Sequence, residues 1–124
     1  MHFDKILKDG YTRDPSYITT SATFDAKKNA DDGLIDKVEN LKEMPIYILS
    51  GTKDDVIPPE MHDSMKMFYD KFGSDVEFVQ QPWNHNWPTD VEESVGLEFN
   101  MPLKDDCTIH GGRRIYNCGF DTAG

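Results

Sequence analysis

A carboxylate and a histidine each follow a strand-like segment of this chain. Asp54 lies in the loop of residues 51–58, after a short apolar run, and His85 lies in the loop of residues 83–90, after a second such segment. Ligands of open parallel α/β sheets bind beyond the carboxyl ends of the strands, so neighbouring strands would bring the two side chains together. A carboxylate that accepts the Nδ1 proton of an imidazole leaves its other nitrogen as a general base. The spacing therefore predicts the acid-and-histidine half of a nucleophilic triad, with Asp55 as the competitor for the acid role.

These residues can also be explained by roles in local structure and packing, without any catalytic function. Asp54 can cap its own turn, and a loop histidine between two tryptophans, Trp83 and Trp87, is more often a packing residue. The same tryptophans are candidates for an apolar wall that binds an acyl chain or polyester, because indole offers a large area at little entropic cost. No metal site is predicted, because the nearby acidic residues lack the spacing of a hard-cation loop, and no cofactor is predicted either.

The elements that must position these residues form a strand–helix–strand unit over residues 45–81. The apolar run of residues 46–49 indicates a strand buried on both faces. Two prolines at 58–59 open a helix, Gly73 ends it, and residues 75–81 form a second strand. This order predicts a right-handed parallel crossover, and hence an α/β fold. The apolar stripe of the helix is expected at Met61, Met65, Phe68 and Phe72.

The flanking segments carry weaker patterns. Residues 1–14 are predicted as loop or poorly ordered. Residues 15–30 are weakly predicted as a helix with Ile18, Ala22 and Ala26 on one face, although a run of hydroxyl residues argues against it. Residues 82–124 are predicted as a histidine loop followed by a tail with little periodicity.

Composition limits the classes of partner. The 124 residues suffice for one domain or part of one, and 13 basic against 23 acidic residues give a net charge of −10, which disfavours binding to a phosphate backbone. We therefore expect no nucleic-acid partner. The sequence has no apolar run long enough to span a membrane and no signal-peptide pattern at its N-terminus, so we expect no membrane span. The spacing of Cys107 and Cys118 matches neither a redox motif nor a zinc motif. From the spacing alone, the two residues could form a disulfide or could be two reduced thiols.

Four segments in order resemble the polyhydroxybutyrate depolymerase-like esterases, a family of α/β-hydrolases. They are residues 33–41, 45–54, 85–90 and 115–124. The resemblance implies that Asp54 is the triad acid and His85 the triad base. It also implies a disulfide between Cys107 and Cys118, and hence an extracytoplasmic location. The chain departs from the family pattern at Asn84, where glycine is expected, and at Phe120, where tyrosine is usual.

The nucleophile of that family is missing. No serine of the chain has the setting of a nucleophile elbow, Gly-x-Ser-x-Gly. We therefore expect the C-terminal portion of an α/β-hydrolase-type parallel sheet with flanking helices. Such a portion is incomplete on its own and inactive alone, with a loss in rate on the order of 10⁶-fold.

The expected partners follow from that incompleteness. They are a complementary N-terminal hydrolase segment or other chains that cover the open sheet, and an ester or polyester substrate in the complete enzyme. The alternatives are a non-catalytic remnant or subunit with a structural role in a larger assembly, and an artificially short gene model.

Overall fold

The computed structural model describes residues 14–90, 107–108 and 115–121, which fall into two compact units. The first unit comprises Met1–Ser50 and Pro58–Val79, and the second comprises Gly51–Ile57 and Gln80–Gly124. The loop predicted for residues 1–14 lies, apart from residue 14, outside the described residues.

The first element of the first unit is the helix α2, Pro15–Asp31. Its N-terminal turn is capped by Asp14, whose side chain accepts a hydrogen bond from the N–H of Ser16 at 2.9 Å. Gly33, with φ of +70°, follows its C-terminal end in the left-handed conformation that often ends a helix. The helix predicted for residues 15–30 is thus confirmed. A short 3₁₀ turn, η2 (Val38–Leu41), leads on towards the first strand.

The hydroxyl residues of α2 do not disrupt the helix. The hydroxyls of Thr20 and Thr23 donate to carbonyl oxygens four residues earlier, at 2.8 and 2.7 Å, so they reinforce the helical turn rather than compete with it. The face of Ile18, Ala22 and Ala26 is not the buried face of the helix, because Ala22 is exposed and Thr19 is fully buried. Thr19 Oγ1 lies 3.1 Å from the carbonyl oxygen of Ser64 in the neighbouring helix α3, so a small polar side chain forms this helix contact.

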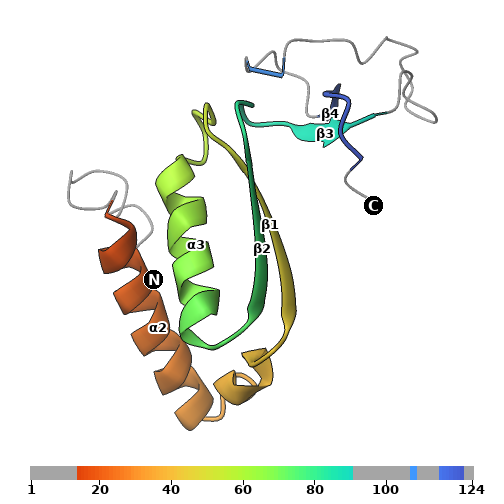
Figure 1. The fold of residues 1–124 in the computed structure, drawn as a ribbon. Helices are drawn as coiled ribbons and strands as arrows, with labels where there is room; N and C mark the ends of the chain where they lie inside the picture. Colours follow the sequence, from red (N-terminus) through yellow and green to blue (C-terminus); the bar gives the residue numbers. More distant parts are fainter. Residues whose placement is uncertain (1–13, 91–106, 109–114, 122–124) are drawn as a thin grey trace. The chain divides into compact units, whose positions relative to one another are not determined.

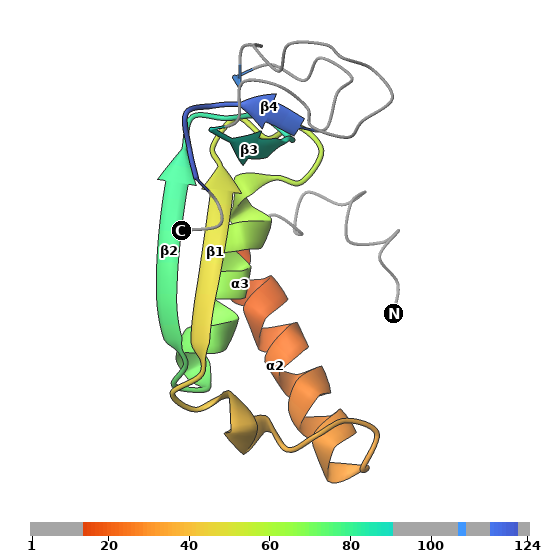
Figure 2. The ribbon, with the colours of Figure 1, turned by 90° about the vertical axis from the view of Figure 1, so that its right-hand side faces the viewer.

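The predicted strand–helix–strand unit is confirmed. It consists of β1 (Pro45–Gly51), α3 (Pro59–Lys71) and β2 (Asp75–Gln81), and Gly73 follows the helix with φ of +75°. The two strands pair with each other and run in the same direction (Figure 2). The described chain is therefore a mixture of helices and small parallel sheets, which is compatible with an α/β fold.

The helices cover only one face of the β1–β2 pair in the described part of the first unit. Both helices lie on the same side of the strands, with α3 between α2 and the sheet (Figure 1). On β1, Ile48 and Ser50 are buried, whereas Tyr47 on the opposite face is 51% exposed. The prediction of a strand buried on both faces is thus wrong for the residues described. The stripe on α3 is also displaced, because Met65 is exposed and Ser64 is buried against α2.

A second parallel pair lies in the second unit. The strand β3 (Trp87–Thr89) pairs with β4 (Ile115–Asn117), with Trp87 opposite Ile115 and Thr89 opposite Asn117. Both stretches were expected to be loop. Strands of three residues are too short to show a periodic pattern, and a proline argues against a strand. Here Pro88 is buried in the middle of β3, opposite the buried Tyr116.

Candidate active site

Asp54 is fixed in the turn that follows β1. Its Oδ1 accepts hydrogen bonds from the N–H groups of Val56 and Ile57, at 2.9 and 2.7 Å. This is the local bonding by which aspartate stabilises a turn, and it accounts for the position of the residue directly after a strand. The side chain is only 8% exposed, so its orientation is restricted by both burial and hydrogen bonds.

The second oxygen of this carboxylate binds His85. Oδ2 of Asp54 lies 3.0 Å from Nδ1 of His85, within hydrogen-bond distance, and both residues belong to the second unit. The structure therefore brings together the two residues that the sequence singled out. The imidazole is 46% exposed, whereas the carboxylate is nearly buried. The neighbouring Asp55 is exposed, and its N–H lies 3.4 Å from the side-chain oxygen of Asn84.

This geometry determines which imidazole nitrogen is basic. A carboxylate accepts a proton and has none to donate when it is ionised, so it selects the tautomer with hydrogen on Nδ1 of His85. The lone pair of the neutral ring is then on Nε2. An imidazole oriented in this way can take a proton from a hydroxyl group and pass it on to a leaving group.

Ser50, the serine closest to Asp54 in the sequence, has the wrong surroundings for a nucleophile. It is fully buried in β1, and its hydroxyl has no hydrogen-bond partner among the described residues. A nucleophile elbow presents its hydroxyl at an exposed, sharp turn between a strand and a helix. The structure therefore agrees with excluding Ser50 from that role.

A close backbone approach holds the acid loop beside the segment that leads to the histidine. A Cβ atom on Gly51 would lie 2.4 Å from the carbonyl oxygen of Trp83, so only glycine fits there without a shift. Next to it, Thr52 N–H donates to Gln81 O at 2.8 Å and Lys53 N–H donates to Trp83 O at 3.1 Å. The sequence indicated Gly51 only as the end of a strand; its role in the close approach requires the structure.

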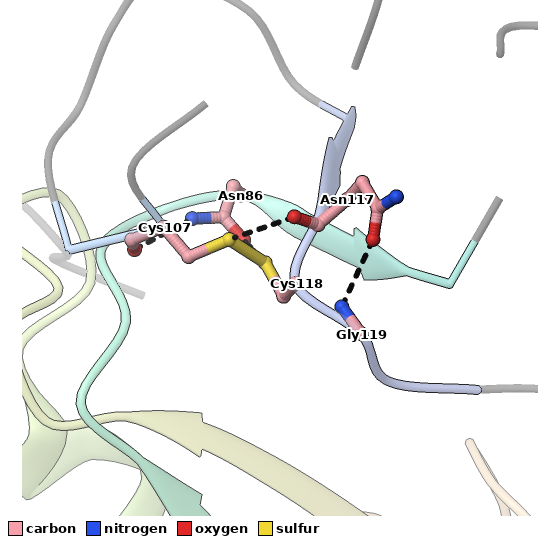
Figure 3. The surroundings of a disulfide bond; sticks show 5 residues. All are labelled: Asn86, Cys107, Asn117, Cys118 and Gly119. Carbon is pink, nitrogen blue, oxygen red and sulfur yellow. Dashed lines mark hydrogen bonds between the residues drawn. A yellow bond between two sulfur atoms is a disulfide. The ribbon is translucent and has the colours of Figure 1, made fainter. Parts of the chain in front are cut away.

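The histidine loop is tied to the disulfide segment. Asn84 N–H and the side-chain Nδ2 of Asn86 both donate to the carbonyl oxygen of Cys107, at 2.7 and 3.1 Å (Figure 3 draws the Asn86 bond). Cys107 forms a disulfide with Cys118, whose N–H donates to Thr89 O at 2.8 Å. The sequence did not predict that the two asparagines would bond to Cys107. Their acceptor is a main-chain carbonyl oxygen, which every residue has, so no sequence pattern marks it.

The two tryptophans of this loop have different surroundings. Trp83 packs edge-to-face on Phe120, with ring centroids 5.2 Å apart. Trp87 is 66% exposed, although its backbone belongs to β3. The contact of Trp83 favours the packing alternative for that residue, whereas the side chain of Trp87 is exposed.

Metal-binding clusters and membrane-spanning helices are both absent from the described residues. Among them, the structure has no group of three or more histidine, cysteine or acidic side chains that could hold a metal ion. Within the same ranges, none of the helices has the length and apolar character needed to cross a membrane.

Two curated proteins are similar to this chain along most of its length. A "Poly(3-hydroxybutyrate) depolymerase" of Delftia acidovorans is 28% identical over 114 residues, which cover 89% of this chain and 21% of that protein. A "Polyhydroxybutyrate depolymerase" of Talaromyces funiculosus is 26% identical over 126 residues, which cover 99% of this chain and 33% of that protein. The chain thus spans about a fifth to a third of the length of these relatives.

The other comparisons found no match. No family model and no solved structure matches the chain. The resemblance to the polyhydroxybutyrate depolymerases that the sequence indicated is confirmed by the two relatives, and it supports a hydrolase-like family.

Proposed function

We propose that this chain supplies the acid and the general base of a serine carboxylester hydrolase similar to the polyhydroxybutyrate depolymerases. One observation carries the proposal: Asp54 Oδ2 lies 3.0 Å from His85 Nδ1 while Asp54 Oδ1 is held by two N–H groups. The acid and the base of a triad need this relation, because the carboxylate must orient the ring and stabilise the imidazolium. The two relatives, named as depolymerases, support the class of reaction and the substrate class.

The proposed reaction is acyl transfer through a covalent intermediate. A serine hydroxyl from outside these residues attacks the ester carbonyl, and Nε2 of His85 takes its proton. The imidazolium, stabilised by Asp54, then gives this proton to the departing alkoxide, which leaves an acyl-serine. Water attacks the acyl group while His85 takes a proton from it. The imidazolium then returns this proton to the serine oxygen as the acyl–oxygen bond breaks, which releases the carboxylic acid and regenerates the serine and the neutral histidine.

The same proposal assigns roles to the other parts of the chain. The unit of β1, α3 and β2 is part of a larger hydrolase sheet, whose remaining segment covers the open face around Tyr47. Trp87 contacts the acyl chain or polyester, and its high exposure supports that role. The disulfide between Cys107 and Cys118 supports an extracytoplasmic location, because disulfides persist in oxidising compartments.

A segment exchange tests the proposal. We would replace the matching 114 residues of the Delftia acidovorans depolymerase with this chain, and measure hydrolysis of p-nitrophenyl butyrate and of poly(3-hydroxybutyrate). The hybrid should hydrolyse both, and His85→Ala should lower the rate by about 10⁴-fold or more, since loss of a triad histidine removes the general base. Asp55→Asn, a matched change beside the triad acid, should keep most of the activity.

Two outcomes would contradict the proposal. A hybrid that hydrolyses esters equally well with and without His85 does not use this histidine as its base. A hybrid that folds, as judged by circular dichroism, but hydrolyses neither ester would favour the alternative of a non-catalytic remnant or subunit.

A further inference from the structure

We propose that Asn86 is a positioning residue for His85, and that it acts through the carbonyl oxygen of Cys107. The inference rests on the proposed function, because it concerns how the base of that triad is held. Asn86 directly follows the histidine, and its Nδ2 donates to Cys107 O at 3.1 Å. Its Oδ1 lies 3.9 Å from Sγ of Cys118, so the amide group of Asn86 lies beside both cysteines of the disulfide (Figure 3).

The residue on the other side of the histidine binds the same oxygen. The main-chain N–H of Asn84 donates to Cys107 O at 2.7 Å. A carbonyl oxygen has two lone pairs and can accept both bonds. His85 therefore lies between two residues that are bonded to a single acceptor, and these two bonds restrict the backbone on either side of it.

The acceptor is also connected to the far end of the histidine loop. Cys107 is bonded through the disulfide to Cys118, which directly follows β4. Cys118 N–H donates to Thr89 O at 2.8 Å, at the end of β3, and β3 pairs with β4. Bonds thus run from the histidine loop to Cys107, across the disulfide and back to the end of the same loop. These bonds close a ring that joins the start of the histidine loop to its end, and this ring limits how far the loop can change its conformation.

The hydrogen bond from the Asn86 side chain is the one bond to Cys107 O that a single substitution can remove without changing the rest of the segment. The bond from Asn84 is made by the main chain, and breaking the disulfide changes the whole segment. Without the Asn86 donor, one of the two hydrogen bonds to Cys107 O that flank His85 is lost, and the imidazole is less closely confined to the position 3.0 Å from Asp54. A misplacement of about 1 Å at a reacting group can cost about 100-fold in rate. We expect that loss for Asn86→Ala in the active hybrid, with kcat affected rather than KM.

The decisive readout is the tautomer of His85, because a merely structural role would not change it. The full 124-residue chain, labelled with ¹⁵N in its histidines, is compared with Asn86→Ala by long-range ¹H–¹⁵N spectra at a pH where the ring is neutral. The unsubstituted chain should carry the proton on Nδ1, and Asn86→Ala should show a mixture of the two tautomers. Asn117→Ala is the matched control, because the side chain of Asn117 binds Gly119 N–H at 3.0 Å in the same unit, and its removal should leave the His85 signals unchanged.

The outcomes separate this inference from the proposed function. If Asn86→Ala keeps the Nδ1–H tautomer in full, the inference is wrong while the triad proposal stands. If the unsubstituted chain carries its proton on Nε2, the triad proposal itself is wrong. Should Asn86→Ala fail to fold, Asn86→Leu fills nearly the same space without a donor; it must show the same mixture, and a spectrum like that of the unsubstituted chain overturns the inference.

Discussion

Oδ2 of Asp54 lies 3.0 Å from Nδ1 of His85, while Oδ1 of the same carboxylate binds two N–H groups of its own turn. The sequence offered two interpretations of Asp54, a turn cap and the acid partner of a histidine. The structure combines them, with one oxygen atom for each. The bonds that hold the turn also fix the carboxylate plane, so the turn orients the oxygen that faces the imidazole.

Two substitutions of Asp54 should separate these two tasks. Asp54→Asn keeps an oxygen for the turn but offers the imidazole no anionic acceptor, so it should lower the activity of the hybrid by about 10⁴-fold with little loss of stability. Asp54→Ala removes both hydrogen bonds to the turn. Besides the loss of activity, it should therefore lower the free energy of unfolding by about 2 kcal/mol. Urea unfolding of the full chain measures this difference; equal destabilisation by both substitutions would show that the turn does not depend on Oδ1.

The glycine at the end of β1 should resist substitution. In Gly51→Ala the new Cβ would meet the Trp83 carbonyl oxygen at 2.4 Å, and a backbone atom cannot yield as a flexible side chain does. We expect a loss of about 1–3 kcal/mol in the free energy of unfolding, as for other overpacked sites. We also expect the amide resonances of residues 83–85 to shift.

Gly33→Ala is the control for this substitution. Gly33 has a positive φ but no atom within 4 Å of the added Cβ, so its replacement should leave those resonances in place. A Gly51→Ala spectrum with equally unchanged resonances would contradict the close approach.

The hydroxyl of Thr19 should stabilise the contact between α2 and α3. Thr19 Oγ1 lies 2.6 Å from Pro15 O in its own helix and 3.1 Å from Ser64 O in α3, and its single proton is shared between them. Thr19→Val keeps the shape of the side chain but removes this donor, which should cost about 1 kcal/mol of unfolding free energy. Thr20→Val removes a similar hydroxyl on the exposed side of the same helix, and should change stability by less than about 0.5 kcal/mol. Chemical denaturation of both variants tests the difference, and equal effects would rule out a special role for the buried hydroxyl.

The disulfide should be present in the purified protein and should stabilise it. Intact-mass spectrometry without reductant should show Cys107 and Cys118 as oxidised. Reduction should lower the free energy of unfolding by up to about 3 kcal/mol, because a closed loop of this length restricts the unfolded chain. Two free thiols in protein isolated under oxidising conditions would remove the support for an extracytoplasmic location.

The regular elements could be predicted where the sequence contains both a pattern and a clear end. The unit from β1 to β2 was predicted because an apolar run, a pair of prolines and Gly73 delimit it. The buried faces of the helices could not be predicted from apolar spacing, since Thr19 and Ser64 form the contact. The pair of β3 and β4 could not be predicted either, because pairing of three residues at long separation leaves no periodic signal.

The candidate site could also be predicted only in part from the sequence. The approach of Asp54 and His85 could be expected because the carboxyl ends of parallel strands meet at one edge of a sheet. The ties of the histidine loop to Cys107 could not be expected, because they depend on a main-chain oxygen that any residue would provide. The environment of Trp83 depends likewise on Phe120, which is distant in the sequence.

The most direct test of the account is the protonation of the His85 ring in the full chain, with and without the carboxylate of Asp54. Long-range ¹H–¹⁵N spectra should show the ring hydrogen on Nδ1 and not on Nε2 in the unsubstituted chain, and Asp54→Asn should abolish this preference. A spectrum with hydrogen on Nε2, or one that Asp54→Asn leaves unchanged, would show that Asp54 does not orient this histidine, and the proposed acid and base pair would be wrong.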